Sequence, residues 1–236
     1  MNKNRTEMNR IITLGNLKGG AGKSTVAMLL ALYLHEKGYN VQVIDGDVQH
    51  TIAKKRDEEL RKRKENNVQE RLYDIVKVEP SNKQAYYETL TNAMEFDGIV
   101  ISDTPGNLEL DAVSYNYRIS NAVIVPYRYD DNVIDSTIGF TIYLEDLRKD
   151  FADFTAPIFY LPNNMIRNWG TAEERKIWDA VDKEFLMKHG TVLPPLPMRK
   201  HFQNLTTIEM GSQLKKSLEG YFDDIIKTVI EEKTNG

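Results

Sequence analysis

A glycine-rich stretch near the N-terminus combines residue types that suit phosphate chemistry. It runs from Lys18 through Gly19, Gly20, Ala21 and Gly22 to Lys23, Ser24 and Thr25, directly after a short apolar segment. Glycine accepts the φ angles that let backbone N–H groups curl around a phosphate, and it places no side chain in the way. Lys23 supplies a positive charge to the phosphates, and the Ser24 hydroxyl is a ligand for Mg²⁺. The pattern therefore predicts the phosphate-binding loop of a nucleotide site.

Carboxylates follow two other apolar segments of the chain. Asp45 and Asp47 come at the end of residues 41–44, and Asp103 ends residues 99–103. Carboxylates at the carboxyl end of a parallel strand face the crevice in which open α/β sheets bind ligands. An apolar strand that ends in an acid has the Walker B form, so Asp103 is expected to hold Mg²⁺ through water.

Alternating strands and helices are expected to position these groups. Residues 10–16 are predicted to form a buried strand, and residues 23–37 a helix that ends at Gly38. Further strands are expected at 41–44, 72–78, 99–103, 122–126 and 157–162, and further helices at 81–94 (with Ser81 as N-cap), 108–120, 133–148, 171–189 and 214–233. The expected fold class is α/β, a doubly wound and mostly parallel twisted sheet with helices on both faces.

Length and composition limit the function classes. The 236 residues suit a loose arm at residues 1–9 and a single domain at residues 10–236. The absence of cysteine excludes disulfides, cysteine-ligated iron–sulfur clusters and thiol catalysis. No apolar run is long enough to span a bilayer and no secretory signal is visible, so the expected location is the cytoplasm. The net charge of −4 means that any binding to nucleic acid must come from a local basic patch.

The loop departs from the ordinary P-loop in a specific way. The pattern G-x-x-x-x-G-K-[ST] needs glycine at position 17, where this chain has Leu17, and Lys18 follows. K-G-G-x-G-K-[ST] resembles the deviant Walker A loop of the ParA partition ATPases and MinD. The resemblance implies a P-loop ATPase that binds ATP and Mg²⁺ and forms a homodimer on ATP. It also implies that Lys18 reaches across the dimer interface to the nucleotide of the partner.

The same resemblance assigns roles to the acidic strand ends. Partition ATPases usually carry D-x-D-P-Q where this chain has Asp45, Asp47 and Gln49, with Val48 in place of the proline. By resemblance, Asp47 positions or activates the attacking water beside Mg²⁺, and Asp45 is an outer partner near the metal. Residues 103–106 resemble the D-T-P-G segment of the family, and residues 104–106 are expected to sense the γ-phosphate. The substitution by Val48 leaves the conformation of the loop open.

Other segments provide candidates for adenine and DNA contacts. The resemblance implies that Asn163 contacts adenine and that Pro197 and Met198 line its pocket, although asparagine in a turn is also common. Arg199 and Lys200 are candidates for DNA contact. Residues 54–65 hold seven basic and four acidic residues and are expected to form an exposed helix, either a DNA-facing surface or an ordinary solvated face.

Together these features favour a switch ATPase. The resemblance implies slow, partner-stimulated ATP hydrolysis, non-specific DNA binding by the ATP dimer, and a role in plasmid partition or conjugative transfer. A ParB-like or relaxosome adaptor protein is the expected partner, and the ATP-bound protein is expected on the nucleoid. Two alternatives stay open, a MinD-like positioning ATPase and a metabolic ligase of the same superfamily. A binding module without hydrolysis is also open if the loop with Val48 misplaces Asp47. Acidic residues in the last helix oppose membrane binding, and the expected role of that helix is to pack on the sheet.

Overall fold

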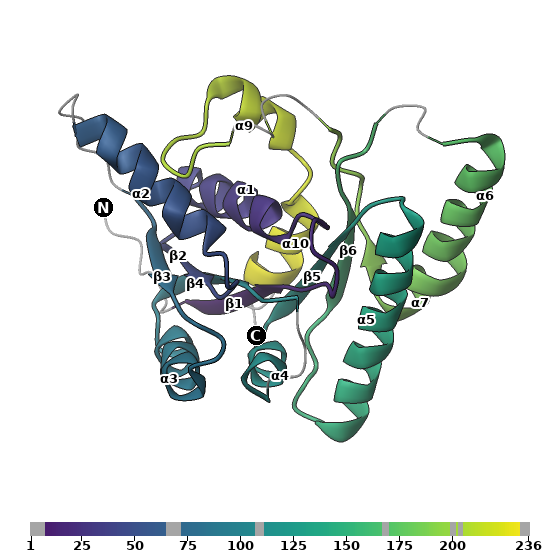
Figure 1. Cartoon of the computed structure of the whole chain (residues 1–236), viewed down its shortest axis with the longest axis horizontal. Helices are drawn as coiled ribbons and strands as arrows, with labels where there is room; N and C mark the ends of the chain where they lie inside the picture. Colours follow the sequence, from purple (N-terminus) through teal and green to yellow (C-terminus); the bar gives the residue numbers. More distant parts are fainter. Residues whose placement is uncertain are drawn as a thin grey trace.

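The structure is a computed structural model that describes residues 8–64, 72–106, 111–166, 170–198, 202 and 205–231. Within these ranges, seven parallel strands form one sheet in the order β3-β2-β4-β1-β5-β6-β7 (Figure 1). The strands are β1 (Asn9–Leu14), β2 (Val41–Asp45), β3 (Asp74–Lys77), β4 (Gly98–Asp103), β5 (Ala122–Tyr127), β6 (Ile158–Pro162) and β7 (Thr191–Val192). This sheet confirms the predicted fold class.

Helices cover both faces of the sheet (Figure 1). They are α1 (Lys23–Glu36), α2 (Thr51–Lys64), α3 (Lys83–Met94), α4 (Asp111–Arg118), α5 (Asp131–Asp150), α6 (Ala172–Ala180), α7 (Met187–His189), α9 (Ser212–Leu218) and α10 (Asp223–Ile226), with π-helical turns η1 (Val181–Leu186) and η2 (Lys227–Glu231). Helices α1, α9 and α10 pack on one face, and α3, α4 and α5 on the other. Among the described residues, no helix combines the length and apolar character that a membrane crossing requires.

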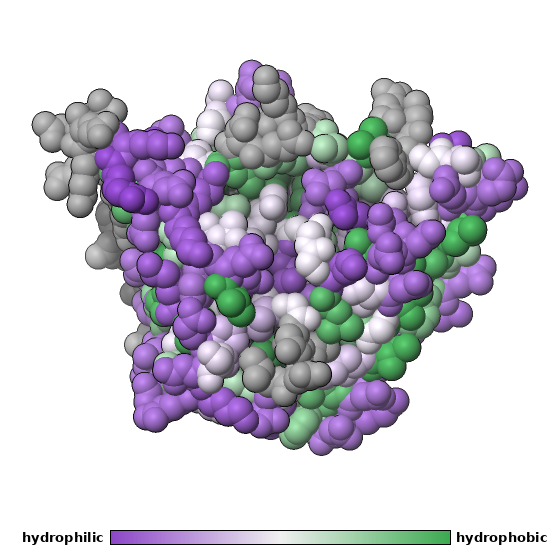
Figure 2. Space-filling model, in the orientation of Figure 1, coloured by the Kyte–Doolittle hydropathy of each residue, from purple (hydrophilic) through white to green (hydrophobic). Residues whose placement is uncertain are grey.

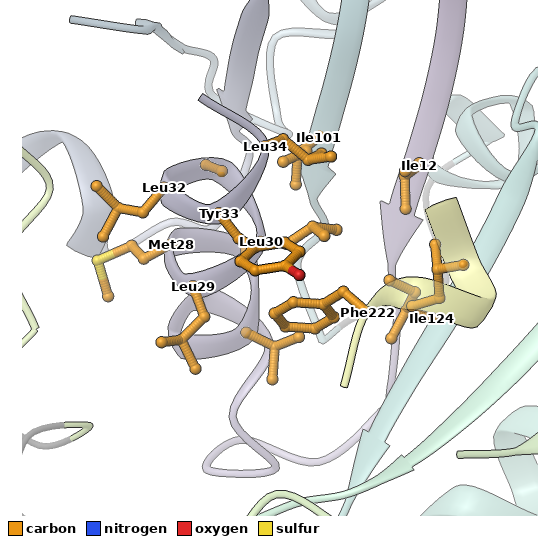
Figure 3. Close-up of a cluster of buried hydrophobic side chains, with 14 of the residues drawn as sticks. Ile12, Met28, Leu29, Leu30, Leu32, Tyr33, Leu34, Ile101, Ile124 and Phe222 are labelled. Atoms are coloured by element: carbon orange, nitrogen blue, oxygen red, sulfur yellow. The ribbon is translucent and has the colours of Figure 1, made fainter. Parts of the chain in front are cut away.

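The alternation of side chains along the strands explains the two layers. On β1, Ile12 belongs to the core beneath α1, whereas the adjacent Ile11 packs with residues of α3 and α4. In the first of these cores, Phe222 lies beside Tyr33 of α1, with 5.7 Å between ring centroids (Figure 3). Strands buried on both faces are continuous apolar runs, as in other parallel sheets.

Several predicted boundaries shift. Strand β1 begins at Asn9, one residue before the predicted start of the strand, and residues 1–7 of the predicted arm lie outside the described ranges. The N-cap of α3 is Asn82 and not Ser81, because the Asn82 side chain accepts a hydrogen bond from the Ala85 N–H at 3.2 Å. Gly38 has a φ of 87° after α1, the conformation expected of a residue that ends a helix.

The C-terminal segment is broken where one long helix was expected. The chain turns at Gly220, which has a φ of 87°, so α9 is separated from α10 and η2. This left-handed conformation is easily adopted by glycine and interrupts a helix. The apolar residues Phe222, Ile225, Ile226, Val229 and Ile230 are nevertheless buried in the core with α1. The prediction that this segment packs on the sheet is confirmed.

Candidate nucleotide-binding site

The glycine-rich loop connects β1 to α1 at the carboxyl edge of the sheet. Gly22 is the N-cap of α1 with a φ of 102°, and its carbonyl accepts the first helical hydrogen bond from the Val26 N–H at 2.9 Å. A β-carbon at Gly22 would collide with the Asn163 side chain, so both backbone conformation and close packing require glycine there. The loop therefore leads directly into a helix N-terminus, where unpaired N–H groups and the helix dipole favour a phosphate.

Lys23 lies inside this loop. The residue is 7% exposed, and Nζ donates a hydrogen bond to the Asn16 carbonyl oxygen at 3.2 Å. Burial lowers the pKa of Lys23, while the negative charges of Asp103 and Asp47 oppose that shift. The ammonium group is thus held near two carboxylates, in a place where anionic phosphate oxygens would offset its loss of hydration.

Asp103 ends β4 in a fully buried position. It lies opposite Asp45 in the parallel register of β4 and β2. Burial raises the pKa of Asp103 to about 7, although Ser24 and Lys23 nearby act in the opposite direction. Neither carboxylate oxygen of Asp103 has a hydrogen-bond partner of good geometry in the described chain. A buried carboxylate without a partner, beside the Ser24 hydroxyl, fits a hard cation such as Mg²⁺.

Asp45 supports the start of α2. Its Oδ2 accepts a hydrogen bond from the Ala53 N–H at 2.8 Å, which satisfies a donor in the first turn of that helix. Its other oxygen is buried and unpartnered among the described residues. Burial raises the pKa of Asp45, and the bond from Ala53 opposes the shift. Asp45 therefore borders the candidate metal site while it caps a helix.

Asp47 lies on the loop that follows β2. Its Oδ1 accepts a hydrogen bond from the Gln49 N–H at 2.9 Å, and the preceding residue, Gly46, donates its N–H to the Asp103 carbonyl at 3.0 Å. The Asp47 side chain is half-buried, whereas Val48 is 67% exposed. The structure thus brings Asp47 near Lys23 and Asp103, at the same edge of the sheet.

The segment after β4 touches the glycine-rich loop. The Thr104 hydroxyl donates to the Leu14 carbonyl at 2.7 Å and lies 2.8 Å from the Tyr117 hydroxyl. A β-carbon at Gly106 would lie 3.0 Å from the Leu17 carbonyl oxygen and 3.8 Å from Lys23 Nζ. The proposed γ-phosphate sensor is therefore adjacent to the loop that it would monitor.

Asn16 is a site residue that the sequence analysis missed. Its buried Nδ2 donates to the Pro126 carbonyl and to the Thr137 hydroxyl, both at 2.9 Å. Its Oδ1 accepts hydrogen bonds from the Lys18 N–H at 3.3 Å and from the Ser136 hydroxyl at 3.0 Å. Asn16 thereby ties the start of the loop to β5 and α5. A single asparagine before a glycine-rich turn gives no sequence signal for such a network.

Lys18 differs from Lys23 in its surroundings. The Asn16 side chain holds its backbone, but the Lys18 side chain is exposed to solvent. The loop therefore carries one buried and one exposed lysine five residues apart. The residues proposed to bind the nucleotide or metal, Lys18 through Thr25 with Asp47 and Asp103, all gather at the carboxyl edge of the sheet.

Two of the three predicted adenine residues, Asn163 and Met198, border a cavity of about 430 Å³ beside the loop. Asn163 lines this cavity, and its buried side chain donates Nδ2 to the Ala21 carbonyl at 3.1 Å. Met198 also lies in the wall, and Pro197 pairs with the lining residue Met165 in a parallel bridge. The other lining residues are Arg128, Tyr129, Asp130, Asp131, Asn164, Met165, Ile166, Glu174 and Trp178.

An aromatic wall of this cavity was not predicted. Tyr129 stacks on Trp178 with 5.1 Å between ring centroids and 12° between planes. The hydroxyls of Tyr127 and Tyr129 each donate to a different oxygen of Asp182, which is buried in η1. Residues 172–189 were correctly predicted as helical, but sequence spacing does not reveal the π-helical turn that carries Asp182.

The basic residues of 54–65 do not share one environment. Arg56 is buried; it donates to the Thr207 hydroxyl and carbonyl and to the Tyr73 carbonyl, so it links α2 to the C-terminal part of the chain. Lys54 and Arg61 are exposed, and hydrophilic side chains cover the outer surface around α2 (Figure 2). The expectation of a uniformly exposed basic face is wrong for Arg56. Glu65, Arg199 and Lys200 lie outside the described residues.

Known proteins share this architecture. A plasmid partition protein from Borrelia burgdorferi, solved with AMPPNP, matches with a TM-score of 0.69 and 18% identity, over 94% of this chain and all of that chain. A variant of McdA from Cyanothece, solved as its ATP complex, gives a TM-score of 0.66 and 14% identity, over 94% of this chain and 97% of that chain. Cobyrinic acid a,c-diamide synthase from Mycobacterium smegmatis, solved with an ATP analogue and magnesium, gives a TM-score of 0.65 and 18% identity, over 95% of this chain and 96% of that chain. At these identities the likeness establishes the fold.

Sequence comparisons extend the relationship. An uncharacterised protein of Methanocaldococcus jannaschii is 46% identical over 43 residues, which are 18% of this chain and 17% of that protein. The profile of the CobQ/CobB/MinD/ParA nucleotide binding domain matches residues 12–207, a span that contains the glycine-rich loop, both acidic strand ends and Asn163. The chain therefore belongs to the CobQ/CobB/MinD/ParA family of nucleotide-binding proteins.

Proposed function

We propose that the chain is an ATP-dependent dimerising switch that hydrolyses ATP slowly and binds DNA without sequence preference, in plasmid partition or conjugative transfer. One observation carries this proposal. The glycine-rich loop holds a buried lysine, Lys23, for its own nucleotide and an exposed lysine, Lys18, on the same loop. A solvent-exposed lysine at this point is available to a second nucleotide in a face-to-face dimer.

The site supports a division of roles for hydrolysis. Lys23, Ser24, Thr25 and the loop amides would bind the phosphates, and Ser24 with Asp103, acting through water, would hold Mg²⁺, with Asp47 beside them. The metal, when bound, neutralises charge on the phosphate oxygens. Asp47 is half-buried at the mouth of the same site and orients the attacking water. Asn163 and Met198 border the proposed adenine pocket, and Pro197 supports it through its bridge to Met165.

The DNA-binding part of the proposal depends on exposed cations. Lys54 and Arg61 of α2 are exposed, and Arg199 and Lys200 are further candidates. Because the chain is acidic overall, such a patch would bind the phosphate backbone locally and lose affinity steeply with salt. A ParB-like or relaxosome adaptor protein stimulates hydrolysis and opens the dimer, and the ATP-bound form resides on the nucleoid.

The test measures binding to a non-specific DNA duplex without nucleotide, with ADP, and with ATP and Mg²⁺. Wild type is compared with Asp47→Ala, expected to trap the ATP state, and with Lys18→Ala, expected to remain monomeric. The proposal predicts binding only with ATP, longer-lived in Asp47→Ala and lost in Lys18→Ala. Dimerisation of Lys18→Ala on ATP at the wild-type level would refute the role in trans.

The same experiment separates the two alternatives. A dimer that hydrolyses ATP and binds no DNA under any condition favours a MinD-like ATPase or a metabolic ligase. Co-sedimentation with anionic liposomes in the presence of ATP then identifies the first. The apolar residues of α10 and η2 are buried in the core, so that segment offers no free apolar face to a membrane in this structure.

A further inference from the structure

The loop that carries Asp47 ends at a histidine with an unusual backbone conformation. His50 has a φ of 46°, in the left-handed region that only a few per cent of non-glycine residues adopt. Such conformations persist where surrounding contacts enforce them, and they collect at functional sites. The His50 side chain is 12% exposed, although the loop itself lies at the surface.

Both ring nitrogens of His50 face oxygen atoms from neighbouring strand ends. Nε2 lies 2.8 Å from Oε1 of Glu79, two residues after β3, and Nδ1 lies 3.2 Å from the carbonyl oxygen of Asp45, the last residue of β2. An imidazolium donates at both nitrogens and a neutral imidazole at one. In either form the ring fastens the end of the loop to the sheet.

Backbone hydrogen bonds transmit this attachment to Asp47. The His50 N–H donates to the Asp47 carbonyl at 2.9 Å and closes a tight turn, and the Gln49 N–H donates to the Asp47 carboxylate. The other end of the loop is fixed by the bond from Gly46 to the Asp103 carbonyl. Val48 between them is largely exposed, so side-chain packing at that position does little to hold the turn.

We propose that His50 is a positioning residue for ATP hydrolysis: its ring, held between Glu79 and the Asp45 carbonyl, fixes the 46–50 turn so that Asp47 faces the phosphate site. We call this arrangement the His50 clamp. It rests on the proposed role of Asp47. A loosened turn lets Asp47 sample misaligned positions, and misplacement by about 1 Å can reduce a rate by as much as a hundredfold. Phosphate binding is carried by the separate β1–α1 loop and is expected to be unaffected.

The test combines His50→Asn and Glu79→Ala with the double variant. Asparagine tolerates the left-handed conformation but is too short to reach Glu79, so backbone strain is not a confounding factor. Each single variant is expected to lower kcat about tenfold and to leave the Kd for ATP within about twofold, and the double variant to be no slower than His50→Asn. The matched control is Asp57→Ala, which removes an ion pair with Lys77 (3.3 Å) that also links α2 to β3 but does not touch the turn.

Amide hydrogen exchange provides a readout independent of catalysis. Exchange in residues 46–50 is expected to accelerate in His50→Asn and Glu79→Ala and to be unchanged in Asp57→Ala and in α1. Unchanged exchange, a kcat within about twofold of wild type, or parallel losses of kcat and ATP affinity overturn the clamp. Asp47→Ala separates the two proposals. If it hydrolyses ATP at the wild-type rate, the assigned role of Asp47 fails; if it is inactive while His50→Asn is not slowed, only the clamp fails.

Discussion

Two buried carboxyl groups in this molecule have opposite surroundings. Asp103, at the end of β4, has no hydrogen-bond partner of good geometry for either oxygen among the described residues, whereas both oxygens of Asp182 in η1 accept bonds from tyrosine hydroxyls. Burial raises the pKa of both. Burial alone therefore does not identify a functional carboxylate. The absence of well-formed hydrogen bonds among the described residues distinguishes a group that can receive a ligand from one that completes the fold.

The residues around Asp103 and Asp182 differ in the same way as the two carboxyl groups. Near Asp103 lie two further carboxylates, Asp45 and Asp47, and the buried Lys23, an arrangement that suits a bound cation and phosphates. Around Asp182, the stacked Tyr129 and Trp178 and the close approach of Gly170 to the indole form a packed wall. We expect substitutions in the first region to change activity more than stability, and substitutions in the second to do the reverse.

The largest expected effect is that of Asp103→Asn on hydrolysis. An amide of the same shape keeps the packing but removes the negative charge that a metal needs, so we expect kcat/KM for Mg²⁺·ATP to fall a hundredfold or more, about 3 kcal/mol. Steady-state hydrolysis measures this loss. Asp182→Asn is the matched control, since it removes a buried charge of the same size and should leave hydrolysis within about threefold. Equal losses in the two variants would contradict the distinction between the two carboxyls.

Asp182→Ala should have the next largest effect, on stability. It leaves two phenolic hydroxyls without their acceptor and creates a cavity, so we expect a loss of about 2 kcal/mol in the free energy of unfolding. Urea denaturation measures it at constant m-value. The free energy of ATP binding should change by less than the free energy of unfolding, because the stacking of Tyr129 on Trp178 preserves the cavity wall. A stability unchanged from wild type would show that the tyrosines find other partners.

The pKa of Asp103 predicts a pH dependence with a defined sign. The pKa is raised from 3.8 to about 7 in the folded protein, so between these values the folded state binds more protons than the unfolded state. The contribution of Asp103 to the free energy of unfolding therefore decreases as the pH rises from about 4 to 7, and it stays constant above pH 7. Asp103→Asn should remove this contribution and stabilise the nucleotide-free protein at pH 8 by about 1 kcal/mol or more. Denaturation at pH 5 and pH 8 measures the change; a variant that is less stable than wild type at pH 8 contradicts it.

The sequence predicted most of the sheet and the place of the glycine-rich loop for identifiable reasons. Strands buried on both faces, such as residues 98–103, are largely continuous apolar runs. The loop between β1 and α1 is marked by several glycines that are followed by the polar residues Lys23, Ser24 and Thr25. These signals are local. The N-cap of α3 was missed by one residue because Ser81 and Asn82 both suit that position, and only the fold decides which side chain reaches the Ala85 N–H.

The parts that were not predicted depend on contacts between distant residues. Asn16 meets Thr137 across 121 positions, and Arg56 meets Thr207 across 151. A buried arginine within a basic helix has the same local sequence pattern as an exposed one. Similarly, Tyr129 stacks on Trp178 from a different element of the fold, and no pattern in the sequence links these two positions. Motifs and the family resemblance give most residues of the candidate site, but the fold adds Asn16 and gives the partners of the others.

The smallest expected effects concern the basic residues of α2, where Lys54 is exposed and Arg56 is buried against other parts of the fold. Lys54 is exposed, so Lys54→Ala should change the free energy of unfolding by less than about 0.5 kcal/mol. If this face binds DNA, the same variant should weaken binding in the presence of ATP moderately at every sequence and reduce the salt slope by about one. Lys216→Ala, an exposed lysine on α9, is the control and should leave the slope unchanged. Lys54 and the buried Arg56 lie two residues apart on one helix, and Arg56 binds Thr207. If Lys54→Ala keeps the wild-type salt slope, α2 has a structural role through Arg56, and the DNA-binding surface lies elsewhere.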